Sequence, residues 1–250
     1  MKQQITSLLT LASSIGLLSA SSISVNFNSD RDAAAALAPA AAAGAPGYST
    51  SGWNNFNGIP SAAGPYTQTT ADIDGPNAGS LSNDGGIIQA GMTVSWTANN
   101  TWNTSNGTGN PDNQLMNGYL DNNAGNPIIP ISITGVPYSS YTVVAYFGSD
   151  GNDRTGLVDL NGDAFSYSTY SQLGGTFPVD YLQTTDTGTG NPNANYAVWT
   201  GQTATDFTLS INRGSNNSGF HGFQIIESVP EPSTGLLFGL SGLLLFRRKR

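Results

Sequence analysis

Aromatic side chains beside polar loops are the first residues of this sequence whose chemistry can be inferred. Trp102 lies in "NNTWNTSNGTGNPDNQ", and Trp53 and Tyr119 also stand next to Asn- and Gly-rich segments. An exposed aromatic ring combines a rigid apolar face with polar neighbours, which is what stacking on a sugar ring requires. The pattern therefore predicts carbohydrate binding by Trp102, Trp53 and Tyr119. The alternative is that tryptophans such as Trp53 and Trp199 anchor the core, which is the commoner position of this residue.

Clustered carboxylates suggest a second chemistry, the binding of a hard cation. Asp72 and Asp74 stand in "ADIDGPN", and Asp150, Asn152 and Asp153 stand in "SDGNDRTG". Calcium prefers carboxylate and carbonyl oxygens, so a structural calcium ion is a candidate cofactor. Neither segment is a complete EF-hand loop, because the terminal Glu is missing. Ordinary turn formation by Asp, Asn and Gly is the alternative.

Residue types suited to catalysis are sparse. His221 is the only histidine, no Gly-x-Ser-x-Gly motif precedes it, and a packed histidine is the simpler interpretation. The absence of cysteine and the single histidine exclude thiolate zinc sites and three-histidine metal centres. Glu227 is the only glutamate between residues 21 and 227, so a glycosidase would need a pair of aspartates. The sequence predicts a non-enzymatic protein, with a polysaccharide-active hydrolase using an Asp pair as the alternative.

The segments that would position these residues have the alternation of β-strands. Apolar residues alternate with polar ones around Val25, Val94, Ile131 and Leu209, and Asn-, Asp- and Gly-rich turns separate the runs. Residues 141–147, "YTVVAYF", are apolar on both faces and predict a central strand. Further strands are expected in "TGLVDL", "AFSYSTY", "NYAVW" and "FHGFQII". This pattern predicts an all-β fold, an antiparallel β-sandwich of jelly-roll type.

One segment of the predicted β-sandwich region departs from the strand pattern. Residues 32–47, "DAAAALAPAAAAGAPG", contain helix-stopping Pro and Gly and predict a mobile surface loop.

The segments "VNF", "WNN", "LMNGYLD" and "GFQII" together resemble secreted galactose-binding-like or malectin-like β-sandwich modules. That resemblance implies the sandwich fold more than any activity.

Charge is distributed unevenly along the chain. Between residues 21 and 227 three arginines stand against fifteen acidic residues, and the chain as a whole has a formal net charge of −8. Such an acidic surface repels phosphate backbones, which argues against a nucleic-acid partner.

The N-terminus has the layout of an export signal. "MKQQITSLLTLASSIGLLSASS" begins with Lys2, continues with an apolar stretch from about residue 5 to residue 18, and ends in small residues. This order is typical of a secretory signal peptide. We therefore expect a signal peptide at residues 1–20, with cleavage near Ala20.

The C-terminus is apolar and then strongly basic. Residues 235–246, "GLLFGLSGLLLF", carry no charge, and a helix of this length would reach about 18 Å. A bilayer core is roughly 30 Å thick, so the predicted transmembrane helix is short. The positive-inside rule places the following basic residues in the cytoplasm and the acidic body outside. These residues are Arg247, Arg248, Lys249 and Arg250.

Together these features resemble a known signal. Val229, Pro230, Glu231 and Pro232, followed by a short apolar helix and a basic end, resemble the PEP-CTERM sorting signal, a region also catalogued as an ice-binding protein C-terminal domain. The resemblance implies a temporary inner-membrane anchor that an exosortase cuts near the Pro-Glu-Pro motif, in Gram-negative bacteria that make extracellular polysaccharide. A permanent C-terminal anchor is the alternative. Ice binding itself is not indicated, because no regular Thr-x-Thr ladder is present.

The sequence as a whole thus predicts three parts. These are a signal peptide at residues 1–20, a β-sandwich at 21–227 and a sorting signal at 228–250. The expected protein is exported, passes through an inner-membrane-anchored intermediate and reaches the cell surface or the extracellular polysaccharide matrix. There it would act as a structural or carbohydrate-binding component, with extracellular polysaccharide as its expected partner.

Overall fold

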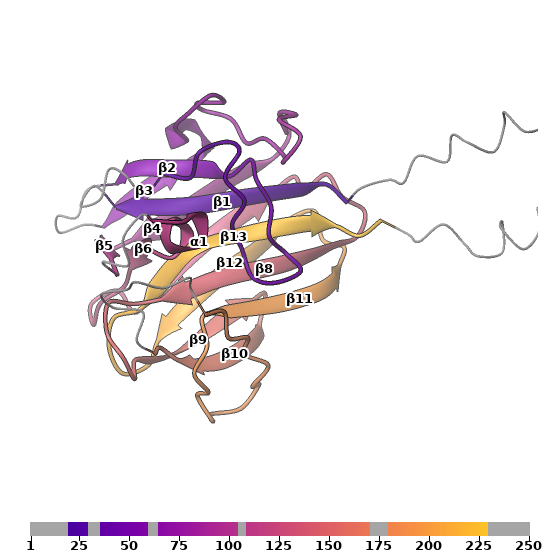
Figure 1. The fold of residues 1–250 in the computed structure, drawn as a ribbon. Helices are drawn as coiled ribbons and strands as arrows, with labels where there is room; N and C mark the ends of the chain where they lie inside the picture. The colour runs from indigo at the N-terminus through magenta and orange to yellow at the C-terminus, as the bar shows by residue number, and fades with distance from the viewer. Residues whose placement is uncertain (1–19, 30–35, 60–64, 105–108, 171–179, 230–250) are drawn as a thin grey trace, which may run out of the picture. The chain divides into compact units, whose positions relative to one another are not determined.

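A computed structural model describes residues 20–29, 36–59, 65–104, 109–170 and 180–229 (Figure 1). The chain divides into Ser21–Ser228, called the body below, and a second unit formed by the two chain ends. Most of the predicted signal peptide, the sorting residues Pro230, Glu231 and Pro232, the apolar segment and the basic tail lie outside the described residues. Within those residues, no helix is long and apolar enough to cross a membrane.

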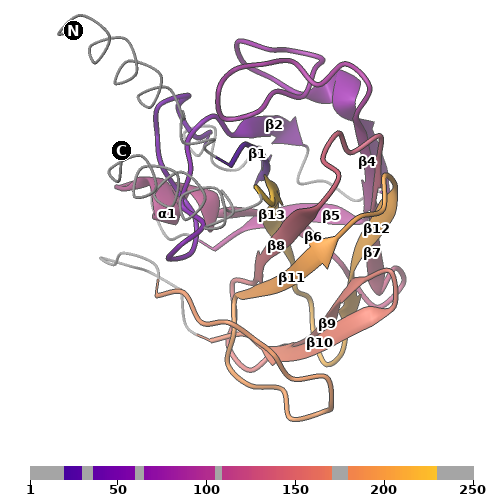
Figure 2. The ribbon, with the colours of Figure 1, turned by 90° about the vertical axis from the view of Figure 1, so that its right-hand side faces the viewer.

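The body is built from two β-sheets that face each other (Figure 2). The first is a seven-stranded sheet with the order β11-β8-β13-β1-β2, which β6 and β5 extend from β13. It contains β1 (Ser22–Ser29), β2 (Asn54–Ile59), β5 (Asn100–Asn103), β6 (Gly118–Asp121), β8 (Tyr141–Gly148), β11 (Tyr196–Gln202) and β13 (Gly219–Glu227).

The second is a six-stranded sheet with the order β10-β9-β12-β7-β4-β3. It contains β3 (Tyr66–Thr69), β4 (Thr93–Ala98), β7 (Ile128–Thr134), β9 (Thr155–Leu160), β10 (Asp163–Ser168) and β12 (Phe207–Arg213). Two short helices, η2 (Thr70–Asp72) and α1 (Pro111–Leu115), complete the described elements. The sequence pattern did not predict either helix.

The predicted all-β, sandwich-like architecture is confirmed. Each run singled out by alternation forms a strand, and β8 lies inside its sheet between β11 and β13. One strand pair departs from the antiparallel expectation, since β1 and β2 run parallel. The jelly-roll connectivity remains a prediction.

The main core lies between the two sheets and follows from the period of two in each strand. On β8, Val143, Ala145 and Phe147 belong to the core between the sheets. They pack with apolar residues from the opposite sheet, such as Ile131 and Leu209. Apolar burial of this kind is the main stabilising contribution to the fold.

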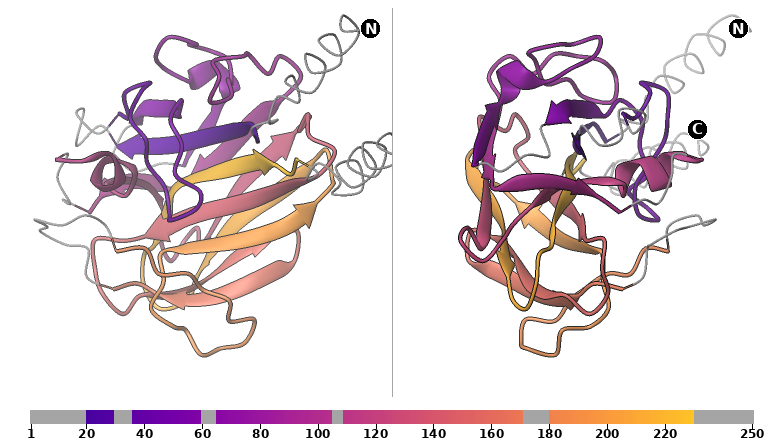
Figure 3. Two further views of the ribbon diagram at one scale, coloured as in Figure 1. Left: turned by 45° about the vertical axis from the view of Figure 1, so that its right-hand side comes forward. Right: turned by 90° about the vertical axis from the view of Figure 1, so that its left-hand side faces the viewer.

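A second apolar cluster covers the outer face of the seven-stranded sheet. The sheet contributes Val144 and Tyr146 of β8 to this cluster, and the segment before β2 contributes Leu37, Ala43 and Trp53. Figures 1 and 3 show this segment, drawn in indigo, crossing over β1 and β13 toward β8. The outer face of this sheet is therefore dry rather than exposed to water.

This cluster corrects the expectation for residues 32–47. The described part of the 32–47 segment lies at the surface but is held against the sheet, because Leu37, Ala43 and Ala45 are buried in this cluster and the Ala45 amide donates to the Tyr146 hydroxyl at 3.1 Å. Its remaining residues are mostly exposed. The polar positions of β1 are buried as well. Asn26, for example, donates from Nδ2 to Asn55 Oδ1 at 3.0 Å, whereas its own Oδ1 has no hydrogen-bond partner among the described residues.

The body begins and ends at the same pole. The Glu227 amide donates to the Ser21 carbonyl at 2.8 Å, which places the last residue of β13 beside the residue before β1. Strand β13 then connects this pole with the opposite one, where Gly219 begins it (Figure 1). Eight residue steps of extended chain span about 26 Å.

Candidate ligand-binding pocket

The two-stranded ribbon of β5 and β6 forms the floor of a polar pocket. Asn100 pairs with Asp121, and Trp102 pairs with Tyr119. Directly opposite residues of an antiparallel pair share a face, as do residues two apart on one strand, so these four side chains lie on the same face. Leu120, on the other face of the ribbon, belongs to the main core.

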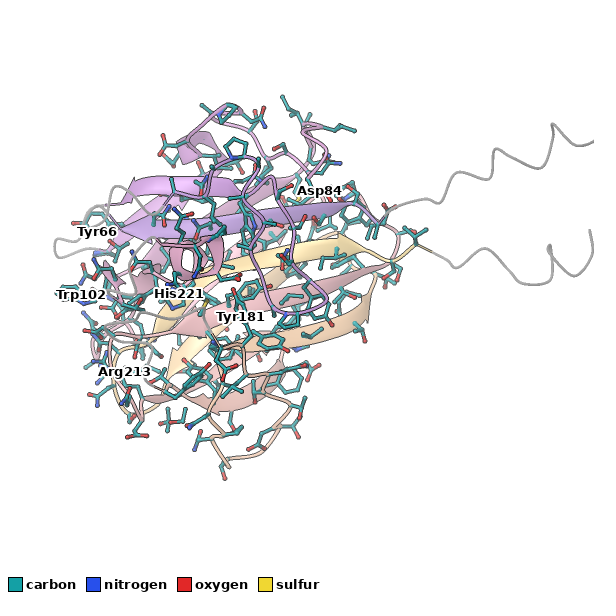
Figure 4. All side chains as sticks on the ribbon, viewed as in Figure 1. Tyr66, Asp84, Trp102, Tyr181, Arg213 and His221 are labelled. Carbon is teal, nitrogen blue, oxygen red and sulfur yellow. The ribbon has the colours of Figure 1, made fainter. Side chains whose placement is uncertain are left out.

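Two loops complete the pocket, which has a volume of about 360 Å³. The β8–β9 loop contributes Asp150 and Arg154, and the β12–β13 loop contributes Asn216 and Asn217. The pocket is lined by Asn100, Trp102, Tyr119, Asp121, Asp150, Arg154, Asn216 and Asn217. Figure 4 places Trp102 at one end of the body and Asp84 near the other end.

Charged hydrogen bonds hold the loops in place. Arg154 Nη1 lies 2.7 Å from Asp150 Oδ1 and donates to the Asn217 carbonyl at 2.9 Å. The Tyr119 hydroxyl donates to the same Asp150 oxygen at 3.1 Å. Arg154 therefore joins the two loops, and Tyr119 joins them to the ribbon.

Asp121 is a pocket side chain whose hydrogen bonds are incomplete. It is 5% exposed, its Oδ2 accepts from Asn217 Nδ2 at a long 3.4 Å, and its Oδ1 has no hydrogen-bond partner among the described residues. Burial raises the pKa of this carboxyl from its usual 3.8 to about 7, and the nearby Asp150 carboxylate adds to the effect. Asn100 Oδ1, from the neighbouring strand, is likewise buried without a donor in the described part of the chain.

His221 lies behind the ribbon and not in the pocket lining. It is fully buried, its ring centroid is 5.3 Å from that of Tyr119, and its Nδ1 lies 2.8 Å from the Gly118 carbonyl. Burial lowers the pKa of the imidazole to about 4, so the ring is neutral at neutral pH. This placement agrees with the expected packed histidine.

The three aromatic residues predicted to bind sugar have different positions. Trp102 is half-buried and lines the pocket. Tyr119 also lines it, but with 1% exposure it contributes its hydroxyl and not a stacking face. Trp53 is 5% exposed, packs against Tyr146 and donates its indole N–H to the Thr50 carbonyl at 2.9 Å. The prediction that Trp53 presents a stacking face is therefore wrong, because the 36–53 segment buries the ring.

The predicted cation ligands do not converge. Asp72 caps η2, where its Oδ2 accepts from the Thr69 amide at 2.8 Å. Asp74 forms a bridge with Asn55, while Asn152 and Asp153 are exposed beside the pocket residue Asp150. Across the described ranges, no group of three or more His, Cys, Asp or Glu side chains is arranged to hold a metal ion. A structural calcium ion remains a prediction.

Five pocket residues were not predicted as site residues, namely Asn100, Asp121, Arg154, Asn216 and Asn217. The alternation of the sequence contained a signal for two of them, because Asn100 and Asp121 each stand two positions from a predicted aromatic residue in a short strand. No local pattern pointed to Arg154, Asn216 or Asn217.

A larger pocket of about 640 Å³ lies between the 36–39 and 74–86 segments. Its central polar side chains are already satisfied within the protein: Asn54 Nδ2 donates to the Ser82 carbonyl at 2.8 Å, and Asn54 Oδ1 accepts from the Ser82 amide at 2.9 Å. The β5–β6 pocket contains two buried oxygen atoms that lack hydrogen-bond donors, and it is therefore the better candidate for a ligand site.

Comparison with known proteins identifies only the C-terminal end of the chain. No curated protein and no solved structure matches the chain. The resemblance of the body to galactose-binding-like modules thus remains a prediction. Residues 228–250 match the PEP-CTERM protein-sorting motif, so the chain carries the signal of an exported protein that is anchored in a membrane and processed by an exosortase on its way to the cell surface.

Proposed function

We propose that the body is a carbohydrate-binding component of the cell surface or extracellular matrix, and that its ligand occupies the β5–β6 pocket. One observation carries the proposal: the ribbon places an aromatic residue, Trp102, beside buried oxygen acceptors that lack donors, on Asn100 and Asp121. Buried acceptors are normally paired, so an external donor is expected at this place.

The chemistry of the pocket suits a polyhydroxylated ligand. The Trp102 side chain offers apolar surface for the face of a sugar ring. Asp121 and Asn100 accept hydrogen bonds from ring substituents, while the Arg154–Asp150 pair offers both donors and acceptors.

The position of the pocket also supports this function. Asp121 pairs with Gly219 at the start of β13, whereas the chain leaves the body after Glu227 at the other end of that strand. A ligand site about 26 Å from the exit point leaves room for a bulky polymer while the C-terminus is held by the sorting machinery.

Replacement of Trp102 by alanine tests the proposal. We expect the purified protein to bind specific members of a glycan array that includes the host's own exopolysaccharide, and Trp102→Ala to weaken that binding at least about tenfold. Tyr66→Ala is the matched control, because Tyr66 is a half-buried aromatic residue outside the pocket lining.

Two results would contradict the proposal. One is the absence of binding across the array, which would favour a purely structural matrix protein. The other is equal loss of binding in both variants, which would place the contact outside the pocket.

Replacement of Glu231 by alanine tests the sorting of the protein. Glu231 is the acidic residue of the matched Pro-Glu-Pro motif, and we expect Glu231→Ala to accumulate uncleaved in the inner membrane. Immunoblots of membrane and medium fractions measure this, with Glu227→Ala as the control because Glu227 precedes the matched segment. Release of the Glu231→Ala protein at normal size would contradict exosortase processing.

A hydrolase is the second candidate, favoured by the presence of two aspartates in different environments in one pocket. Asp121 is buried with a raised pKa, whereas Asp150 is ion-paired with Arg154. Glycosidases use two carboxyl groups, one of them tuned as an acid by burial. New reducing ends released from a bound glycan, and their loss in Asp121→Asn, would support this candidate over simple binding.

A further inference from the structure

The pocket has an incomplete charge balance. Arg154 is the only cationic side chain among its lining residues, and it contacts Asp150 and the Asn217 carbonyl. Asp121, on the ribbon, has no cationic side chain in contact among the described residues. The pocket therefore has one carboxylate, Asp150, in an ion pair with Arg154, and a second, Asp121, that interacts with Asn217, Asn100 and the more distant Arg154 charge without an ion-pair contact.

The surroundings of Asp121 define what the partner must offer. Asp121 is 95% buried and its Oδ1 accepts no hydrogen bond from the described residues. Asn100, opposite it in the strand pair, is partly exposed, but its Oδ1 is also buried without a donor. The other titratable or charged groups facing it are Asp150, Arg154 and the Tyr119 hydroxyl. A buried carboxylate is stable when a hydrogen-bonded cation accompanies it. The fitting group therefore carries a positive charge and several N–H donors.

Three kinds of ligand group can be compared on this basis. A sugar hydroxyl brings one donor and no charge, so it satisfies one oxygen and leaves the carboxylate uncompensated. A divalent cation takes six or more oxygen ligands, and the Arg154 guanidinium at Asp150 opposes a second charge there. A primary ammonium brings three donors and a single charge, which matches two acceptor oxygens and one carboxylate.

Resting on the proposed carbohydrate function, we infer that the ligand is an amine-bearing glycan, a polymer with de-N-acetylated amino-sugar units. Its ammonium group would contact Asp121 and Asn100, and its ring would lie on Trp102. Asn100 and Trp102 are two residues apart on one strand face, about 7 Å, close to the size of one sugar unit. The acidic surface of the body, with three arginines against fifteen acids, also attracts a cationic polymer.

Titration calorimetry on the purified full-length protein tests the inference with three probes of equal length: a glucosamine oligomer with free amines, the same oligomer after N-acetylation, and a glucose oligomer. We expect the free-amine oligomer to bind at least about tenfold more tightly than the other two. Asp121→Asn should reduce its affinity to the level of the N-acetylated oligomer. Asp153→Asn, which removes an exposed carboxylate beside the pocket, should retain the preference.

The outcomes separate this inference from the proposed function. Equal affinity for all three oligomers, lost in Trp102→Ala, would overturn the amine preference and leave carbohydrate binding intact. An amine preference that persists in Asp121→Asn would show attraction to the acidic surface alone and would also overturn the inference. Calcium binding to the pocket that displaces the free-amine oligomer would identify Asp121 as a metal ligand instead. Binding of none of the oligomers, together with silence on the glycan array, would remove both proposals.

Discussion

Gly219→Ala is expected to lower the free energy of unfolding by about 3 kcal/mol and to disrupt the pocket. Gly219 starts β13 and pairs with Asp121 on β6 and with Gly148 on β8. A Cβ atom added there would stand 1.5 Å from the Leu120 carbonyl oxygen. Since the obstacle is backbone and not a side chain that could rotate, β6 and β13 must separate.

Urea denaturation followed by tryptophan fluorescence measures this effect. Gly91→Ala is the control, because a Cβ atom at Gly91 meets nothing within 4 Å. We expect the control to change the free energy of unfolding by less than about 0.5 kcal/mol. An unchanged denaturation midpoint in Gly219→Ala would mean that the ribbon moves aside without cost, and the pocket would then be less rigid than its hydrogen bonds indicate.

Asp121→Asn is expected to stabilise the protein at neutral pH while weakening ligand binding. The pKa of Asp121 rises from 3.8 to about 7 on folding, mainly because of burial. As the pH rises from about 4 to 7, the unfolded chain loses this proton before the folded protein does, so stability falls over that window. Asparagine is neutral like the protonated carboxyl, so the variant does not lose stability over that pH window. A shift of this size corresponds to at most about 4 kcal/mol above pH 7.

The difference in stability between the two proteins, measured by denaturation from pH 4 to pH 8, is the informative quantity. It should be close to zero near pH 4 and should grow until about pH 7. His221 has the opposite trend, since its pKa falls to about 4 and stability decreases as the pH drops below 6.5. Both proteins contain His221, so its contribution cancels in the difference.

Asp153→Asn is the matched control. Asp153 is exposed and has a φ of 58°, a left-handed conformation that asparagine also tolerates. We expect its stability to follow that of the unmodified protein at every pH. A pH-independent difference for Asp121→Asn would show that the Asp121 carboxyl is charged at little cost, and that an internal partner already compensates it.

Together, these two results would describe a site that is maintained at some expense of stability. Natural proteins commonly keep groups at functional sites that destabilise the fold. Asp121 is a buried carboxyl with an unpaired oxygen, and it gains a stable environment when a ligand supplies the missing donors. A structural role alone gives no reason for placing an ionisable group at that position.

Features that depend on neighbouring residues were predictable from the sequence. Alternation of apolar and polar residues predicted most of the strands, because a period of two is visible in a single short segment such as the one around Val94. The sorting signal was also predictable, since its motif, apolar segment and basic end are contiguous in the chain. Trp102 and Asp150 could be selected as candidates because both stand in polar loop sequences.

Burial and neighbourhood were decided only by the tertiary structure. Trp53 and Trp102 both stand next to asparagines in the sequence. Trp53 is nevertheless buried in the second apolar cluster, on the outer face of the seven-stranded sheet, whereas Trp102 lines a pocket. Asp121, Asp150 and Asn217 are far apart in the chain and meet because β6 pairs with β13 while β13 also pairs with β8. Strand pairing is set by which apolar faces can be buried together over the whole sheet, and that property cannot be read from any one segment. The strands of the body, the sorting signal and single candidate residues were therefore predictable from the sequence itself. The pocket around the Asp121 carboxyl exists only in the folded protein.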